Sequence, residues 1–126
     1  MGPRHIKTAL AEPTWLDPKV TDISSISAER TAIEISKAGG CAQGIACDVL
    51  NESQQASALE QHLQAYGTLE AVCLNAGIAE TGDFLDMNNA SWLRTLDINL
   101  TAVLVGIRLA AAAMIQQKSK GATETP

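Results

Sequence analysis

A regular alternation between short runs of strand character and longer stretches of helical periodicity is the feature that most constrains the fold. Residues 19–23 and 43–49 are short β-prone runs, and 69–74 is an unbroken apolar run apart from Glu70. Helical periodicity, with apolar residues three or four apart, marks residues 28–35, 56–66 and 90–117. Strands that alternate with helices of this length are joined by parallel crossovers. The sequence therefore predicts an α/β fold: a partial, doubly wound parallel sheet in the order β-α-β-α-β-α, forming a single incomplete domain.

Residues that start and stop helices stand where this pattern needs them. Residues 24–27 offer several serine N-caps for the first helix, and Gly39-Gly40 ends it, because glycine adopts the left-handed conformation without steric cost. Asn51 is the predicted N-cap of the second helix, with Gln54 in capping-box position. Gly67 is expected to end that helix.

Three segments follow from this organisation. Residues 1–18, interrupted by Pro3, Pro13 and Pro18, are predicted to be an irregular N-terminal arm. Residues 19–117 form the partial α/β domain. Residues 118–126 are polar and are expected to be a loose tail.

Composition excludes several classes of function. A net charge of −5 argues against nucleic acid or an anionic membrane as the main partner, since both need concentrated Lys and Arg. The longest apolar run, residues 100–115, is short for a membrane span and contains Arg108. Cys41, Cys47 and Cys73 have no metal-ligand spacing, so no metal site is expected and they are predicted to be small buried residues. A soluble cytoplasmic protein is the expected class.

Polar residues and glycine follow each predicted strand, which is where open parallel sheets bind ligands. These candidates are Asp22, the Asp48-Val49 pair and Asn75-Ala76-Gly77. A carboxylate at the end of the second strand of a dinucleotide fold accepts hydrogen bonds from the adenosine ribose and repels the extra phosphate of NADP. Each also has a plainer interpretation: Asp22 alone is more often an N-cap or turn residue, and the other two could be ordinary turns.

Taken together, the motifs from Val20 to about Gly121 resemble the short-chain dehydrogenase/reductase family. The resemblance rests on Val20-Thr21-Asp22-Ile23, Ala38-Gly39-Gly40-Cys41-Ala42, Cys47-Asp48-Val49, Tyr66-Gly67-Thr68-Leu69, Leu74-Asn75-Ala76-Gly77-Ile78 and Trp92-Leu93-Arg94-Thr95-Leu96-Asp97-Ile98-Asn99-Leu100. It covers about four-fifths of the chain. It implies a Rossmann-like fold and an oxidoreductase of alcohols or ketones that uses NAD(P).

The resemblance also implies roles for matching positions. Asp22 would contact the adenosine ribose and favour NAD over NADP, while the Asp48 carboxylate and the Val49 N–H would hold the adenine edge. Asn75, Ala76 and Gly77 would line the cofactor ribose. Asn99 would be the helix asparagine whose carbonyl helps to hold a water in the proton relay. Leu74 departs from the family pattern, in which many members carry another Asn.

Other parts of the family pattern have no match in this sequence. There is no Thr-Gly-x-x-x-Gly-x-Gly turn for the pyrophosphate, and no catalytic Ser or Tyr-x-x-x-Lys pair. Tyr66 is the only tyrosine, and Gly67 follows it with no Lys four residues later. Because carbonyl reduction needs a proton partner, we expect this chain to be inactive by itself. We also expect the strand at 69–74 to lack neighbours on both sides.

Two alternatives remain open at this point. One is a non-catalytic interaction module that associates with itself or a full-length relative through the helix at 90–117, which carries more apolar residues than one side of a partial sheet can cover. The other is an incomplete or mis-assembled gene product with no independent function. The sequence does not identify a substrate.

Overall fold

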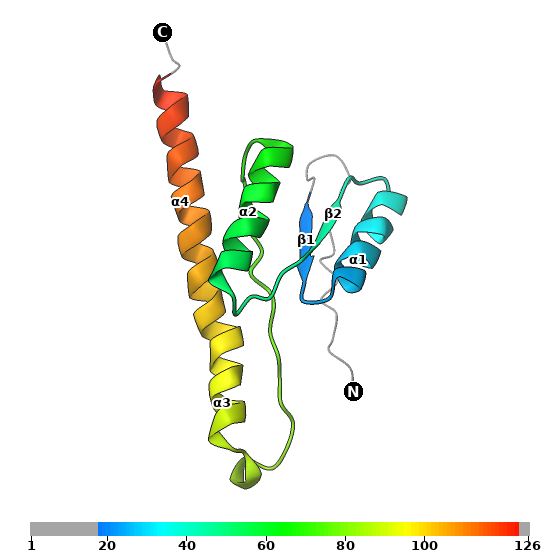
Figure 1. The fold of residues 1–126 in the computed structure, drawn as a ribbon, viewed down its shortest axis with the longest axis vertical. Helices are drawn as coiled ribbons and strands as arrows, with labels where there is room; N and C mark the ends of the chain where they lie inside the picture. Colours follow the sequence, from blue (N-terminus) through cyan, green and yellow to red (C-terminus); the bar gives the residue numbers. More distant parts are fainter. Residues whose placement is uncertain (1–17, 124–126) are drawn as a thin grey trace. The chain divides into compact units, whose positions relative to one another are not determined.

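The computed structural model describes residues 18–123 in the element order β1, α1, β2, α2, η1, α3, η2, α4 (Figure 1). The described chain divides into two compact units, residues 18–67 and residues 68–123. The predicted α/β class is confirmed. The N-terminal arm predicted for residues 1–18 lies almost entirely outside the described residues.

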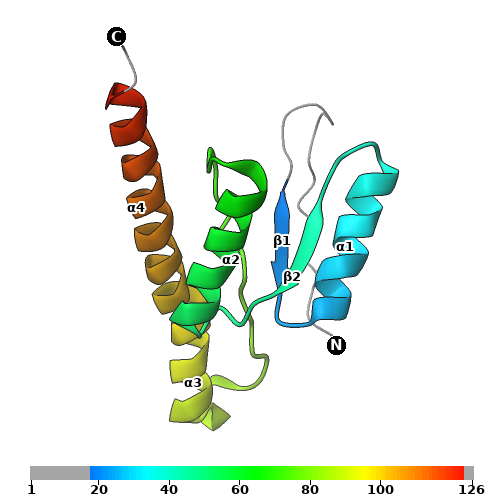
Figure 2. The same cartoon turned by 45° about the horizontal axis from the view of Figure 1, so that its top comes forward.

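The first unit is a two-stranded parallel sheet with helices. β1 (Lys19–Asp22) pairs with β2 (Gln43–Ala46) in a register that sets Asp22 opposite Ala46. The crossover between them is α1 (Ser25–Lys37), and α2 (Glu52–Tyr66) follows β2. The two helices lie on opposite sides of the strand pair in both views (Figures 1 and 2). This is the parallel β-α-β arrangement that the alternating pattern predicted.

Local capping chemistry sets the ends of these helices as predicted. The Ser24 hydroxyl accepts a hydrogen bond from the Ser27 N–H at 3.3 Å, and the Asn51 side chain accepts one from the Gln54 N–H at 3.1 Å. Gly67 follows α2 with a φ of +80°, the left-handed conformation that glycine adopts at low cost. These interactions span only three or four residues, so the sequence pattern alone identifies them.

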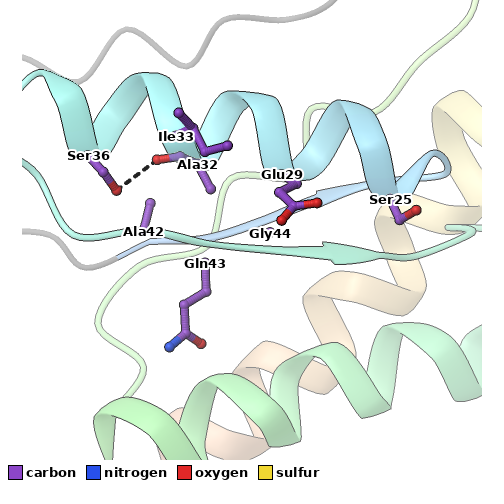
Figure 3. Close-up of a pocket in the computed structure, with 8 residues that line it drawn as sticks. All are labelled: Ser25, Glu29, Ala32, Ile33, Ser36, Ala42, Gln43 and Gly44. Carbon is purple, nitrogen blue, oxygen red and sulfur yellow. Dashed lines mark hydrogen bonds between the residues drawn. The ribbon is translucent and has the colours of Figure 1, made fainter.

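Close contact between α1 and β2 depends on Gly44. A Cβ atom at this position would stand 2.6 Å from the backbone carbonyl carbon of Ala28 and from the backbone nitrogen of Glu29. Beside this contact lies a cavity of about 380 Å³, lined along α1 by Ser25, Glu29 and Ser36 (Figure 3). Glycine therefore lets the strand approach the helix backbone directly.

The second unit is dominated by one long helix. After η1 (Phe84–Asp86), a short 3₁₀ helix, α3 (Asn89–Leu96) runs through a π-helical turn, η2 (Asp97–Thr101), into α4 (Ala102–Thr123). The helix expected at 90–117 is thus present and longer than predicted. Residues 118–123, expected to be a loose tail, are helical.

The third predicted strand, residues 69–74, is not formed. The segment carries no strand assignment, and residues 70–77 make no backbone hydrogen bond with any residue in the range 18–123. A strand is defined by a partner, and within the described chain none is paired with this segment. The prediction of a strand at 69–74 is therefore wrong for the described chain, and whether this run has a neighbour outside residues 18–123 stays untested.

The core of the described chain consists mainly of small residues, with Leu69 and Ile98 as the exceptions. Buried apolar residues are Ala28, Ala32, Cys47, Ala58, Leu69, Ile98, Ala102, Ala110 and Ala113. Cys41 and Cys73 are exposed, so only Cys47 matches the prediction of buried cysteines.

One helix, residues 89–121, is long and apolar enough to cross a membrane, with a mean hydropathy of 2.0 over its most apolar stretch. The core helix of a larger soluble domain has the same character, so length and hydropathy alone assign neither role.

Candidate cofactor-binding site

The carboxyl ends of β1 and β2 bring Asp22 and Asp48 to the same edge of the sheet. The parallel register sets Asp22 beside Ala46, and the Cys47 N–H donates to the Asp22 carbonyl at 2.8 Å, so Asp48 follows immediately. The Asp22 Oδ1 accepts a hydrogen bond from the Ser24 N–H at 2.8 Å. This is the turn role that the plainer interpretation predicted, and it occupies one carboxylate oxygen. The other oxygen makes no hydrogen bond with residues 18–123 and is available to a ligand.

Three hydrogen bonds hold the loop after β2, and they leave one backbone N–H of the loop without a partner among residues 18–123. The Asp48 Oδ1 accepts from the Leu50 N–H at 3.0 Å, and the Asp48 N–H donates to the Gln54 Oε1 at 2.8 Å. The Gln55 Nε2 donates to the Val49 carbonyl at 2.7 Å. The Val49 N–H makes no hydrogen bond within the described part of the chain. The loop thus presents a carboxylate acceptor and a free N–H donor on adjacent residues.

Gln54 and Gln55 hold the backbone of this loop, and the sequence analysis did not assign them to the candidate site. Gln54 was expected to complete a capping box on the Asn51 N–H, but that N–H donates to the Asp48 carbonyl at 2.9 Å. The Gln54 side chain reaches further back, to Asp48. In the sequence, the only sign of this role was the pair of consecutive glutamines in the first turn of α2.

Cys47 adjoins this loop as a neutral side chain. Burial is the main cause that raises the pKa of its thiol above 9.0, and the negative charge of Asp48 raises this pKa further. The thiol therefore stays protonated at neutral pH and adds no charge beside the Asp48 carboxylate. A protonated thiol is also a poor nucleophile, so Cys47 acts here as a packing residue.

In the second unit, the end of the Asn75-Ala76-Gly77 segment is bound to Asn99. The Ile78 N–H donates to the Asn99 Oδ1 at 2.8 Å, and the Asn99 Nδ2 donates to the Ile78 carbonyl at 2.8 Å. A Cβ atom on Gly77 would stand 3.1 Å from the Asn99 Oδ1, which is tighter than ordinary contact. Asn99 lies in the π-helical turn of the long helix, and such turns are frequent at functional sites.

The predicted site residues thus form two groups, one in each unit. Asp22, Asp48 and Val49 belong to residues 18–67, and the Asn75–Gly77 segment and Asn99 belong to residues 68–123. The structure brings residues together within each group. None of them lines the cavity between α1 and β2. Among residues 18–123, no three His, Cys, Asp or Glu side chains cluster in a way that could hold a metal ion.

Comparison with known proteins decides the family. The family model described as short chain dehydrogenase matches residues 17–122. The chain belongs to the short-chain dehydrogenase family. Its fold is accordingly a partial Rossmann fold of the NAD(P)-binding type, and members of the family use a nicotinamide dinucleotide.

Curated short-chain dehydrogenases match most of this chain. A 3-alpha-(or 20-beta)-hydroxysteroid dehydrogenase of Mycobacterium bovis is 34% identical over 110 residues, which is 86% of this chain and 40% of that protein. A 2-(S)-hydroxypropyl-CoM dehydrogenase of Xanthobacter autotrophicus is 31% identical over 76% of this chain and 38% of that protein. The chain spans between 24% and 40% of the length of these and other curated relatives.

A solved structure shows the same fold. The crystal structure of a short-chain type dehydrogenase/reductase from Mycobacterium marinum superposes with a TM-score of 0.75 at 33% identity. The match covers 80% of this chain and 40% of that one. The fold of the described chain is therefore that of part of a short-chain dehydrogenase.

Proposed function

We propose that this chain provides the adenosine- and ribose-binding part of a nicotinamide-dinucleotide site, with a preference for NAD, in an oxidoreductase of alcohols or ketones. The observation that carries the proposal is the edge formed by β1 and β2, where a free carboxylate oxygen of Asp22 lies beside the loop of Asp48 and Val49. Relatives are named as dehydrogenases of hydroxysteroid and hydroxypropyl compounds, which supports an alcohol or ketone as the substrate class.

The chemistry of the first group fits an adenosine. A carboxylate accepts hydrogen bonds from both ribose hydroxyls, and it repels the phosphate that NADP carries at this position. The adenine edge presents an amino donor beside a ring-nitrogen acceptor, which complements the Asp48 carboxylate and the free Val49 N–H. Gln54 and Gln55 hold the loop in this arrangement from either side.

The second group is suited to the remaining ribose. Ala76 and Gly77 carry little or no side chain, so a ligand can come close to this backbone. The Asn99 side-chain amide is bonded to Ile78, which leaves the main-chain carbonyl of the π-helical turn as the group that would hold a relay water. When bound, the nicotinamide would supply or accept the hydride. Because the sequence contains no Tyr-x-x-x-Lys pair, we expect the 126-residue polypeptide by itself not to turn over an alcohol.

The test is a calorimetric titration with NAD and NADP of the Asp22→Asn variant. Asparagine keeps the Oδ1 that accepts from the Ser24 N–H, so the turn is preserved while the charge is removed. We expect NAD affinity to fall about tenfold, because a charge-assisted hydrogen bond becomes a neutral one, and NADP affinity not to fall.

Two further variants complete this test. Asp48→Asn should weaken NAD and NADP alike, because the adenine is common to both. Glu34→Gln removes the same charge from an exposed position on α1 and should change neither affinity. Equal effects of Asp22→Asn and Glu34→Gln on the two cofactors would contradict the proposed role of Asp22.

A second candidate function is an interaction module built on the long helix. Leu100, Leu104, Ile107 and Ile115 are between 52% and 66% exposed, and Trp92 and Leu93 on α3 are also more than half exposed. A soluble protein rarely leaves so much apolar surface without a partner. Members of the family are commonly oligomeric, so a second copy of the chain or a full-length relative is the partner that this surface suits.

A further inference from the structure

Two amide side chains on the long helix each bind both backbone groups of one residue in the extended segment that precedes it. Asn99 does so with Ile78, and Gln117 does so with Leu69. The Leu69 N–H donates to the Gln117 Oε1 at 2.7 Å, and the Gln117 Nε2 donates to the Leu69 carbonyl at 3.1 Å. Each pair is a two-point contact that fixes the position and the orientation of one backbone residue, and we call the pairs the Gln117 clamp and the Asn99 clamp.

The distance between the two clamps is nearly the same whether it is measured along the extended segment or along the helix. From residue 69 to residue 78 an extended backbone rises about 30 Å, at ~3.3 Å per residue. From residue 99 to residue 117 a helix rises about 27 Å, at ~1.5 Å per residue. The segment runs from the Gln117 clamp to the Asn99 clamp, antiparallel to the helix, with little slack in between.

Little else in the described chain holds this segment in place. Residues 70–77 make no backbone hydrogen bond with residues 18–123, so no sheet ladder sets their register there. The Asn99 clamp fixes the end next to Gly77, and the Gln117 clamp fixes the far end. Release of either end would let the segment between them slacken.

We propose that Gln117 is a positioning residue for the Asn75–Gly77 segment. By binding Leu69 it keeps the segment extended, and so holds Asn75, Ala76 and Gly77 at a fixed height along the helix next to Asn99. This inference rests on the proposed function for its effect on the cofactor. The clamp itself is a property of the chain alone.

Gln117→Ala, with Gln116→Ala as the matched control, tests the clamp in the full 126-residue chain. Gln116 is the exposed neighbour of Gln117 on the same helix. The measurements are amide hydrogen exchange by NMR at Leu69 and Ile78, whose N–H groups are hydrogen-bonded, and calorimetric titration with NAD. We expect Gln117→Ala to speed exchange at both amides and to weaken NAD binding about tenfold, as two hydrogen bonds are lost. Gln116→Ala should match the wild type. Faster exchange at Leu69 alone, with Ile78 and NAD affinity unchanged, would overturn the proposal.

Gln117→Glu provides a readout that a general loss of stability would not produce. A protonated carboxyl group donates and accepts like an amide, whereas the ionised form cannot donate to the Leu69 carbonyl. The carboxylate still accepts from the Leu69 N–H, so the readout is the Ile78 amide at the other end of the segment. We expect this amide to be better protected at pH 4, where most of the carboxyl is protonated, than at pH 7, since a glutamate carboxyl ionises near pH ~4.3 or somewhat higher when part-buried. Gln116→Glu should follow the wild type at both pH values.

Protection that does not change with pH in Gln117→Glu would refute the clamp. Because this readout needs no cofactor, it separates the two ideas. Failure of the wild-type chain to bind NAD would refute the proposed function, while the exchange data would still decide the role of Gln117.

Discussion

At the scale of single residues, the two aspartates of the candidate site each make a local hydrogen bond. That bond occupies one carboxylate oxygen and also fixes the orientation of the other. Asp22 gives one oxygen to the turn before α1, and Asp48 gives one to the Leu50 N–H. In both cases the turn orients a carboxylate whose remaining oxygen is available. A role in the turn and a role in ligand binding are therefore compatible, because each uses a different oxygen of the same carboxylate.

Replacement of Gly44 by alanine should lower the free energy of unfolding by a large amount, although it adds only one methyl group. In Gly44→Ala the new methyl group would meet the Ala28 backbone at 2.6 Å, so α1 or β2 must move. We expect the free energy of unfolding, measured by urea titration followed by circular dichroism, to fall by about 1–3 kcal/mol. Gly82→Ala is the control, because a Cβ atom there meets nothing within 4 Å, and it should change stability by less than about 0.5 kcal/mol. Equal stability of the two variants would show that α1 and β2 can move apart to accept the methyl group at no measurable cost in stability.

At the scale of elements, the sequence predicts those whose signals are local. The serine cap of α1, the asparagine cap of α2 and the glycine after α2 all act within three or four residues. The strand at 69–74 failed as a prediction because a strand depends on a partner, and an apolar run carries no information on whether one is present. Gln117 was missed for a related reason: its contact with Leu69 spans 48 residues, and glutamine on a helix surface is common.

The long helix is the element that decides between the two candidate functions. If α4 serves as an association surface, the purified chain should sediment as an oligomer whose fraction rises with concentration. Leu104→Glu should shift it toward monomer, because a buried charge without a partner is costly, whereas Ser119→Glu at another exposed position on the helix should not. Analytical ultracentrifugation would show the difference. Monomeric wild-type protein at high concentration would exclude self-association through α4.

At the scale of the whole molecule, each compact unit carries one group of candidate site residues. The members of both groups come from contiguous sequence motifs at strand and helix ends, and their roles toward a cofactor stay predictions. The supporting residues Gln54, Gln55 and Gln117 came only from the structure, since amide-to-backbone bonds leave no spacing pattern. The central claim is that the group in residues 18–67 binds the adenosine part of a nicotinamide dinucleotide.

The most direct test of that claim is a titration of the isotope-labelled chain with NAD, followed by NMR of the backbone amides. The account predicts that the Val49 amide shifts and reaches saturation as NAD is added. An unchanged Val49 amide in a folded sample would contradict adenosine binding by the group in residues 18–67.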